Sequence, residues 1–505
     1  MSFATVYSRA RVGIDAPLVT IEVHISNGLP AFQIVGLPET SVREARDRVR
    51  SALINSQFQF PQTRITVNLA PADLPKEGGR FDLPIAIGIL AATGQVPLNR
   101  LHEFEFYGEL GLKGDLREII GEIPSTLASA KSNRIAFMPR ANAERAAIVG
   151  TEHLVGSESL LQAFHHLTGQ LTLSELEPLQ HVNENAQSVL DLNDVIGQHS
   201  AKRALEIAAA GQHNLVFLGP PGTGKSMLAQ RLIGILPELT DEQALETSAI
   251  HSVSGKTFDP LTWRRRPFRS PHHTASGVAL VGGGSVPKPG EISLAHNGVL
   301  FLDELPEFDR KVLDVLREPL ETGQVCISRA AQQADFPAQF QLVAALNPSP
   351  TGHHKDGRAS AEQVMKYLNK ISGPLLDRID LQIDVPLLPP GTLSQQSNNG
   401  ESSETVKHRV QQARNVMLAR CNTPNALLSN KQLKQYCALS DADHQFLEQT
   451  INKLQMSIRA YHKILKVART IADLQQSEQI QRAHLAEALS YRAMDRLLSS
   501  LANAC

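Results

Sequence analysis

Cysteine and tryptophan are scarce in this chain of 505 residues, which has four cysteines and one tryptophan. None of the cysteines stands in a CxxC pair, the common spacing of structural zinc sites. The adjacent histidines at 272–273 and 353–354 also lack carboxylate or cysteine partners at metal-ligand spacing, so we expect structural or loop histidines. The density of cysteines is also too low for a disulfide framework. We therefore expect reduced thiols at Cys326, Cys421, Cys437 and Cys505.

A strong net charge and a long apolar run are also lacking. The 49 basic and 51 acidic residues leave a net charge of −2, so nucleic-acid binding would depend on local patches rather than on the field of the whole molecule. The longest apolar stretch, residues 83–92, contains a proline and is too short to span a bilayer. The first residues also differ from the basic and apolar segments of a signal peptide. We expect a soluble cytoplasmic protein that binds no membrane.

The composition is that of a globular protein with several domains. The hydrophobic fraction of 42% is enough for globular cores, and the length predicts about two to four domains. Two polar stretches are typical of linkers, and they divide the chain into three parts. The expected layout is an N-terminal domain at residues 1–172, a linker at 173–190, a central domain at 191–388, a linker at 389–404 and a helical domain at 405–505.

One segment of the central part matches the phosphate-binding P-loop pattern GxxxxGK[ST]. It follows an apolar strand at 215–218 and precedes a helix with one apolar face, which is the context that the motif needs. The glycines allow backbone angles that other residues avoid, and the loop amides would point at phosphates together with the helix N-terminus. The matching residues are Gly219, Pro220, Pro221, Gly222, Thr223, Gly224, Lys225 and Ser226.

The P-loop predicts that the chain binds ATP with Mg²⁺. Lys225 would reach the β- and γ-phosphates, and Ser226 would hold Mg²⁺. A second apolar strand ends at Asp303 and Glu304. The first of these carboxylates would orient Mg²⁺ through its water shell, and the second would polarise the attacking water. These residues together predict ATP hydrolysis.

Two more strands are expected in the same domain. Residues 340–346 are nearly all apolar, as in a strand covered on both faces, and they end at Asn347, whose amide can hydrogen-bond the γ-phosphate or its water. Residues 379–385 alternate strictly, so we expect one solvated face. Arg378 precedes this strand, and an arginine at the rim of a subunit can reach the γ-phosphate bound by a neighbouring subunit.

A C-terminal helix carries an apolar stripe from Ile458 to Ala472. Arg459, Lys463 and Lys466 share a neighbouring face. Such a face could close over a nucleotide or touch a polyanion. For the two lysines we expect solvated side chains.

Taken together, these motifs resemble the magnesium-chelatase-like group of AAA+ ATPases and, within it, the YifB/ComM family, whose three-part layout the chain covers. The resemblance is densest at residues 268–274, 282–292, 372–380, 459–460 and 467–474. It implies that Asn347 is the sensor 1 residue, Arg378 the arginine finger and Arg459 the sensor 2 residue. Arg469 is a second candidate for the last role.

The same resemblance implies a homo-hexameric ring that hydrolyses ATP and acts on single-stranded or branched DNA. Proteins of this family are associated with helicase-driven branch migration when incoming single-stranded DNA is integrated during natural transformation, so recombination proteins are candidate partners. Two alternatives stay open, a chelatase-type motor for metal insertion and a motor that remodels proteins. The chain has no acidic integrin-like metal domain of the kind expected in the chelatase scheme. Stimulation of ATP turnover by DNA would separate these functions.

Two insertions could line the pore of such a ring and contact DNA. Residues 282–292, around Lys288, are typical of an exposed hairpin. Residues 321–340 contain a polar turn near Arg329, where related replicative helicases carry a basic residue. One cation per subunit becomes a ring of cations, and phosphate affinity grows with the number of contacts. The basic run at 263–266 contains the tryptophan, so it could stack on bases or serve in subunit packing.

The N-terminal domain resembles the Lon-protease-like α+β fold related to ribosomal protein S5 domain 2. Peptidases of that kind need a serine and a lysine that activates it. Residues 77–82 contain no serine, residues 121–124 contain no lysine, and Ser125 lacks the pattern. We therefore expect a non-catalytic domain that binds DNA, a partner or neighbouring subunits. Its expected elements are strands at 20–25 and 64–69 and helices at 42–54 and 81–92.

The fold class expected for the whole chain is α/β. It comprises the Lon-protease-like α+β domain, a central AAA+ P-loop α/β domain and a C-terminal helical lid.

Overall fold

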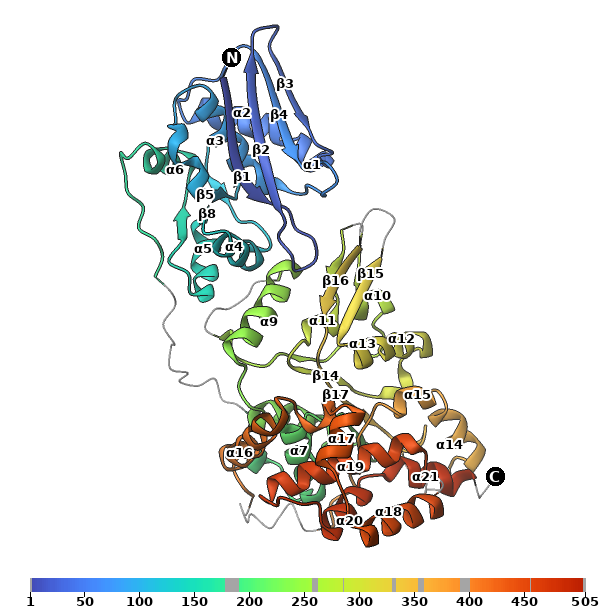
Figure 1. Ribbon diagram of the computed structural model, residues 1–505. Coiled ribbons are helices and arrows are strands. Elements are labelled where there is room, and N and C mark those ends of the chain that lie inside the picture. Colours follow the sequence, from blue (N-terminus) through green and yellow to red (C-terminus); the bar gives the residue numbers. More distant parts are fainter. Residues whose placement is uncertain are drawn as a thin grey trace.

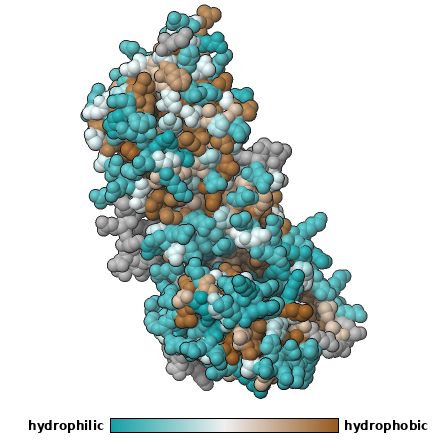
Figure 2. Space-filling model, viewed as in Figure 1, coloured by the Kyte–Doolittle hydropathy of each residue, from teal (hydrophilic) through white to brown (hydrophobic). Residues whose placement is uncertain are grey.

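The computed structural model shows three parts that follow one another along the chain (Figure 1). They are an N-terminal α+β part, a central part around a parallel sheet, and a set of C-terminal helices, as the sequence predicts. The visible surface is mostly hydrophilic with scattered hydrophobic patches (Figure 2). Among the described residues, no helix is both long and apolar enough to cross a membrane. The structure describes residues 2–177, 190–256, 262–284, 286–328, 333–352, 358–390, 400–454 and 456–502.

The N-terminal part is built on a seven-stranded sheet of order β3-β4-β2-β1-β5-β8-β9. Strands β1, β2 and β4 pair antiparallel, whereas β3 pairs parallel with β4, and β1, β5, β8 and β9 pair parallel in turn. The strands expected at 20–25 and 64–69 are confirmed as β2 and β4. The strands of this sheet are β1 Ser2–Arg9, β2 Leu18–Ser26, β3 Ala31–Val35, β4 Arg64–Ala70, β5 Phe104–Phe106, β8 Ile135–Pro139 and β9 Leu154–Ser157. β6 Glu109–Leu110 and β7 Leu116–Arg117 form a separate antiparallel pair.

Helices cover this sheet, and one of them lies wholly inside the domain. Every residue of α3 is buried, because its apolar residues surround the helix axis instead of forming one stripe. It packs against β1 and β2. The expected helices at 42–54 and 81–92 are confirmed as α1 with α2 and as α3. The helices are α1 Thr40–Arg43, α2 Ala45–Asn55, α3 Asp82–Ala92, α4 Glu122–Lys131, α5 Arg140–Ala146 and α6 Leu160–Leu167.

The central part contains a five-stranded sheet of order β11-β14-β17-β10-β18, in which every pair is parallel. Strands β10, β14 and β17 are buried at every residue, as expected for apolar strands covered on both faces. Because all the strands are parallel, their carboxyl ends meet at one edge of the sheet. The strands are β10 Leu215–Leu218, β11 Phe268–Arg269, β14 Val299–Leu302, β17 Gln341–Leu346 and β18 Leu381–Asp384.

The solvated face expected at residues 379–385 is found only at Asp384, the last residue of β18. Gln382 is only 1% exposed, because α21 packs against the strand there. Its side-chain Nε2 donates to Oδ1 of Asp495 at 3.1 Å, and the backbone N of Asp495 donates back to its Oε1 at 3.0 Å. The alternation therefore marks a polar contact between strand and helix.

Two short hairpins project from the central part. β12, Gly282–Gly283, pairs antiparallel with β13, Lys288–Pro289. β15, Gln324–Ser328, pairs antiparallel with β16, Gln333–Pro337. The helices of this part are α7 His199–Gly211, α8 Lys225–Arg231, α9 Asp241–Ser254, α10 Gly277–Val281, α11 Glu291–Leu294, α12 Arg310–Asp314, α13 Arg317–Thr322, α14 Ala361–Leu368 and α15 Gly373–Leu376.

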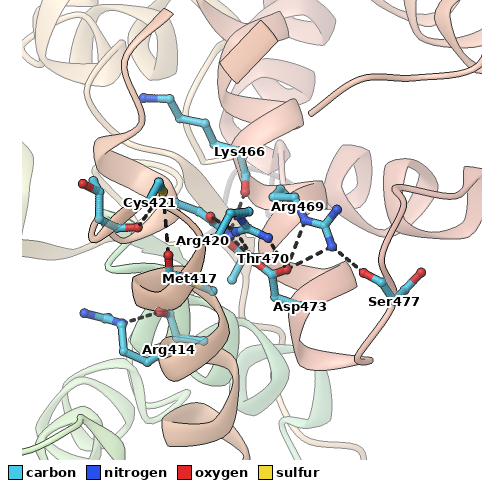
Figure 3. A network of polar contacts seen from close by, with 12 residues as sticks. Arg414, Met417, Arg420, Cys421, Lys466, Arg469, Thr470, Asp473 and Ser477 are labelled. Carbon is cyan, nitrogen blue, oxygen red and sulfur yellow. Dashed lines mark hydrogen bonds and ion pairs between the residues drawn. The ribbon is translucent and has the colours of Figure 1, made fainter. Parts of the chain in front are cut away.

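The C-terminal helices share a core with one face of the central sheet. Apolar residues of α16 and α19 join those of α7, β10 and β18 in one buried cluster. A polar network ties α16 to α19, in which Arg420 donates to both oxygens of Asp473 at 2.8 and 2.7 Å (Figure 3). The helices are α16 Ser403–Cys421, α17 Asn430–Tyr436, α18 Asp441–Lys453, α19 Ile458–Leu474, α20 Arg482–Ser490 and α21 Ala493–Ala502.

The solvated side chains expected for Lys463 and Lys466 on α19 are not found. The Nζ of Lys463 lies 3.2 Å from Oδ1 of Asp380, and their side chains are only 13% and 10% exposed. The Nζ of Lys466 donates to the carbonyl of Ala426 at 2.9 Å. Lys463 therefore attaches α19 to the central part, and Lys466 attaches it to the segment between α16 and α17.

Candidate functional site

The loop between β10 and α8 has the backbone conformation of a phosphate cradle. Gly222 and Gly224 have φ of 80° and 88°, in the left-handed region that side chains other than glycine rarely adopt. The second of these glycines directly precedes α8, which begins at Lys225. The first amides of a helix lack intrahelical acceptors, so the loop and the helix start favour an anion.

The lysine of the motif lies folded over this loop. Its Nζ donates to the carbonyls of Gly219 and Pro220 at 2.7 and 2.8 Å and to Oδ1 of Asn347 at 3.1 Å. Burial lowers the pKa of Lys225, while the carboxylates of Asp303 and Glu304 act in the opposite direction. The ammonium therefore lies among oxygen acceptors next to the carboxylates expected from the sequence.

Ser226 and Asp303 meet directly. The serine Oγ donates to Oδ2 of the aspartate at 2.6 Å, and the other aspartate oxygen accepts the backbone N–H of Glu304 at 2.9 Å. A hydroxyl and a carboxylate are hard oxygen ligands of the kind that Mg²⁺ prefers. Among the described residues, no group of three or more His, Cys, Asp or Glu side chains could hold a metal by itself. This donor set therefore fits Mg²⁺ that also takes oxygens from a bound phosphate.

Glu304 has an unexpected partner. It has a φ of 53°, its side chain is 53% exposed, and its Oε2 lies 3.2 Å from Nδ1 of His273. The ring of His273 also packs edge-on against Phe308. Sequence reasoning predicted a structural or loop histidine here and did not connect it with the phosphate site. The available signal was its position just after β11, because β11 neighbours β14 and parallel strands end at the same edge. His353 and His354 lie outside the described residues.

The structure brings together most of the residues expected at the phosphate site. β10, β14 and β17 are neighbours in the sheet, so the segments that follow them converge at its carboxyl edge. Hydrogen bonds already join the P-loop lysine to Asn347 and the P-loop serine to Asp303.

Arg378 and Arg459 lie at the opposite edge. Arg378 precedes β18, whose first residue Leu381 pairs with Leu215, the first residue of β10. It is therefore separated from the P-loop by the length of a four-residue strand, or about 13 Å at about 3.3 Å per residue. Arg459 Nη1 donates to Oδ2 of Asp377 at 3.1 Å. The structure does not place either arginine at the P-loop of its own chain.

Both arginines line one cleft of about 380 Å³ between the central part and the C-terminal helices. Arg378 is 20% exposed at its side chain and forms an ion pair with Glu321, whereas the side chain of Arg459 is 62% exposed. Burial lowers the pKa of Arg378, and the positive charges of Arg459 and Arg317 lower it further. Two close guanidinium groups would favour an incoming anion.

Arg469, the second candidate for sensor 2, is buried within the helical part. It donates to Oδ1 of Asp473 at 3.1 Å and to the carbonyl of Ser477 at 2.5 Å (Figure 3). It also donates to the carbonyl of Glu478 at 2.8 Å. Only 3% of its surface is exposed. These contacts fix the end of α19, so its side chain holds this helix in place.

Of the two residues expected to contact DNA, the structure describes Lys288 but not Arg329. Lys288 is exposed at the start of β13. Arg329, which directly follows β15, lies outside the described residues. Trp263 packs against an apolar cluster of Ile123, Ile148 and Ala249, between the N-terminal and central parts.

The arginines next to Trp263 also make contacts within the chain. Arg264 lies over the indole ring, with Cζ 5.2 Å from the ring centroid, and forms an ion pair with Asp241. Arg266 donates to the carbonyls of Pro237 and Asn297 at 2.5 and 2.6 Å, and burial lowers its pKa to about 10. Trp263, Arg264 and Arg266 therefore take part in packing inside the chain.

Comparison with known families covers all three parts of the chain. The family described as "Magnesium chelatase, subunit ChlI" matches residues 191–393. The family "Subunit ChlI of Mg-chelatase" matches residues 21–142, and "Magnesium chelatase, subunit ChlI C-terminal" matches residues 400–492.

Individual relatives are similar over very different lengths. The competence protein ComM of Haemophilus influenzae is 58% identical over 100% of both chains. The uncharacterized protein YifB of Escherichia coli is 53% identical over 99% of both chains. The magnesium-chelatase subunit ChlI of Chlorella vulgaris is 25% identical over 33% of this chain and 53% of its own.

Proposed function

The chain belongs to the YifB/ComM family of magnesium-chelatase-like AAA+ proteins, and we propose that it is an ATP-driven, ring-forming motor on DNA. One observation carries the ATPase part of the proposal. Lys225, Ser226 and Asp303 meet at the carboxyl edge of a parallel sheet, beside a loop shaped for phosphate. Phosphoryl transfer needs little covalent chemistry from a protein, so such positioning and charge are most of what it must supply.

Each residue of the site has a role that follows from its place. Lys225 would exchange the two loop carbonyls for β- and γ-phosphate oxygens, which bind an ammonium more strongly because they are charged. Ser226 and Asp303 would hold Mg²⁺, which when bound neutralises charge on the phosphates. Glu304 would polarise the attacking water, and Asn347, already next to the lysine ammonium, would orient that water or the γ-phosphate.

We propose that Arg378 and Arg459 act on the nucleotide of a neighbouring subunit. Both lie at the edge of the sheet opposite to the P-loop and line the same cleft. An arginine that cannot reach its own site can still stabilise the transition state in the next subunit of a ring. This geometry supports the homo-hexamer implied by the family, with Arg378 as the arginine finger and Arg459 as sensor 2.

We propose DNA as the substrate of the motor. The relative from Haemophilus influenzae is named a competence protein and is similar over the full length of both chains. We extend that role to this chain as a helicase that promotes branch migration when single-stranded DNA is integrated during natural transformation. Lys288, exposed on the β12–β13 hairpin, is our candidate phosphate contact. Arg329 stays a prediction.

The full-length similarity favours this function over metal insertion. The chelatase subunit from Chlorella vulgaris matches only a third of the chain, whereas ComM and YifB match both ends of it. Remodelling of a protein substrate is the competing outcome of the test described next.

The test is ATP hydrolysis by the purified full-length chain, with and without single-stranded DNA. We expect turnover that DNA stimulates and that the Lys225→Ala variant lacks. Lys434→Ala, which removes an exposed lysine of α17, is the matched control and should behave as wild type. Turnover in Lys225→Ala would contradict the ATPase site.

A second measurement tests the DNA part separately. A three-stranded DNA junction with a labelled strand should be resolved by the wild-type chain in the presence of ATP and Mg²⁺, and not by Lys225→Ala. ATP turnover that responds to an unfolded protein and not to DNA would favour protein remodelling.

A further inference from the structure

A buried guanidinium without a carboxylate partner lies in the N-terminal part. Arg80 belongs to the short helix Gly79–Phe81, and only 6% of its surface is exposed. Among the described residues its side chain donates one hydrogen bond, from Nη2 to Oγ of Ser125 at 2.6 Å, and forms no ion pair. Its Nε is buried and has no hydrogen-bond partner among them.

This arrangement leaves a charge poorly compensated. A guanidinium has five N–H donors, and a buried charge is costly unless it is paired. The ring of Tyr107, 5.5 Å from Cζ, offsets only part of that cost. Burial lowers the pKa of Arg80 to about 10, so the group still carries its proton at neutral pH. The charges of Glu122 and Glu77 raise this pKa, but no carboxylate of the described residues forms an ion pair with Arg80. Its charge and its Nε donor therefore have no direct partner among those residues.

Arg80 lines a cavity of about 170 Å³. Arg11, Ile119 and Ile120 also line it, together with the backbone of Gly78 and Gly79. Three glutamates complete the wall, and each already has an arginine: Glu77 with Arg11 at 3.2 Å, Glu109 with Arg117 at 3.7 Å, and Glu118 with Arg145 at 2.9 Å. Arg80 is thus the one charged lining residue that forms no ion pair with a described residue.

We propose that this cavity binds a carboxylate, which accepts hydrogen bonds from the guanidinium of Arg80. A carboxylate is planar and matches the fork of a guanidinium with two oxygens. It would also give Arg80 the ion pair that no described residue forms with it. The three wall glutamates would repel a second negative charge, so a phosphate dianion fits less well. The volume admits a small acid or the end of a chain and excludes a nucleotide.

The cavity lies beside the contact between the N-terminal and central parts. A Cβ on Gly121 would lie 3.5 Å from Val253 of α9 and 3.6 Å from Arg11 of the cavity wall. Next to it, Oε2 of Glu122 accepts a hydrogen bond from Ser252 of α9 at 3.2 Å. A carboxylate bound here would therefore occupy a position from which the N-terminal part can sense a ligand and act on α9.

The carboxylate could belong to a small molecule or to the C-terminus of a polypeptide. Both share the chemistry that Arg80 would recognise, so the experiment must separate them. This inference does not depend on the proposed ATPase function.

The test uses the full-length chain and trifluoroacetate as the probe, followed by the line width of its ¹⁹F NMR signal. A small probe that exchanges with a protein of 55.1 kDa broadens strongly. We expect broadening by the wild-type chain, displacement by acetate, and no displacement by chloride at the same ionic strength. Arg80→Met should weaken binding at least about tenfold, because it removes the guanidinium that we propose to pair with the carboxylate. Arg140→Met, which removes an exposed arginine of α5, should bind as wild type.

A second variant and a second competitor complete the design. Arg11→Gln, on the cavity wall, removes a positive charge and frees Glu77, so it should weaken binding several-fold even if Arg80→Met fails to fold. If triglycine displaces the probe better than acetate does, and triglycine amide does not displace it, the ligand is the end of a polypeptide. If acetate displaces the probe better than triglycine does, the ligand is a small acid. The proposal would be overturned if the wild-type chain did not broaden the signal. It would also be overturned if Arg80→Met and Arg11→Gln both broadened the signal as much as the wild-type chain does.

Discussion

The imidazole Nδ1 of His273 lies 3.2 Å from Oε2 of Glu304, and the two residues follow neighbouring parallel strands. Glu304 directly follows Asp303, whose partner is Ser226 of the P-loop. The histidine therefore contacts the one carboxylate that we propose to act on the attacking water. A carboxylate held by the histidine is less free to turn toward a water at the phosphate site.

We expect His273→Ala to raise the basal rate of ATP hydrolysis. An ion pair at an exposed site is worth about 0.2–1 kcal/mol, which corresponds to a change of about 1.4- to fivefold in rate. The measurement is steady-state turnover without DNA at saturating ATP. His273→Gln keeps a hydrogen-bonding side chain that cannot become charged. Its rate of ATP hydrolysis should lie between those of the wild-type chain and His273→Ala. A slower His273→Ala would mean that the histidine holds Glu304 in its productive position.

Removal of the arginine at the far edge of the sheet should abolish turnover without abolishing nucleotide binding. An arginine finger contributes roughly 10³-fold or more to the rate, so we expect a loss of that size in Arg378→Ala. The affinity for a fluorescent ATP analogue should stay close to wild type. Glu321→Gln, which removes the partner of this arginine within the chain, is the matched control and should retain turnover.

Mixing two inactive variants tests whether Arg378 acts between subunits. In a mixed ring, an Arg378→Ala subunit has an intact P-loop and a Lys225→Ala subunit has an intact arginine. Neighbours of these two kinds form a complete site, so the mixture should recover part of the wild-type rate. A mixture as inactive as its components, in a ring whose mixed composition is verified by mass spectrometry, would count against action between subunits.

Local sequence was sufficient for the P-loop, because its glycines and flanking strand and helix are contiguous in the chain. It was also sufficient for the strand that ends at Asp303, because an apolar strand followed by acidic residues is a local pattern. It could not reveal the contact between His273 and Glu304, which depends on the order of strands in the sheet. It also misjudged Gln382 and Lys463, because their partners Asp495 and Asp380 are more than 80 residues away in sequence.

Lys288 should contribute to DNA binding through charge alone. We expect Lys288→Ala to weaken the affinity for single-stranded DNA irrespective of its sequence. The slope of the logarithm of the binding constant against the logarithm of the salt concentration is negative. Losing one contact between a cation and a phosphate makes it shallower by about 0.7, so the affinity of the variant should depend less on salt. Fluorescence anisotropy at several salt concentrations measures both quantities. Lys434→Ala, on α17 in the helical part, is the control; equal slopes for wild type and Lys288→Ala would place the phosphate contacts elsewhere.

The buried contact of Asp380 with Lys463 and His213 should stabilise the attachment of α19 to the central sheet. The Oδ2 of Asp380 lies 3.1 Å from Nδ1 of His213, and its Oδ1 lies 3.2 Å from Nζ of Lys463. Asp380→Ala would leave the lysine buried without its carboxylate, which costs about 3–5 kcal/mol. We expect a lower midpoint of thermal unfolding, and the double variant Asp380→Ala with Lys463→Met should recover part of the loss.

The same contact predicts a dependence of stability on pH. Burial alone would raise the pKa of Asp380, but the charge of Lys463 and the contact with His213 outweigh it and hold that pKa below its usual value. A carboxyl group whose pKa is depressed on folding stabilises the protein above its unfolded pKa and loses that contribution as the pH falls toward the folded pKa. The difference in unfolding midpoint between wild type and Asp380→Ala should therefore be full at neutral pH and shrink below about pH 4. A difference that stays constant down to pH 3 would show that the carboxylate charge is not what stabilises this contact.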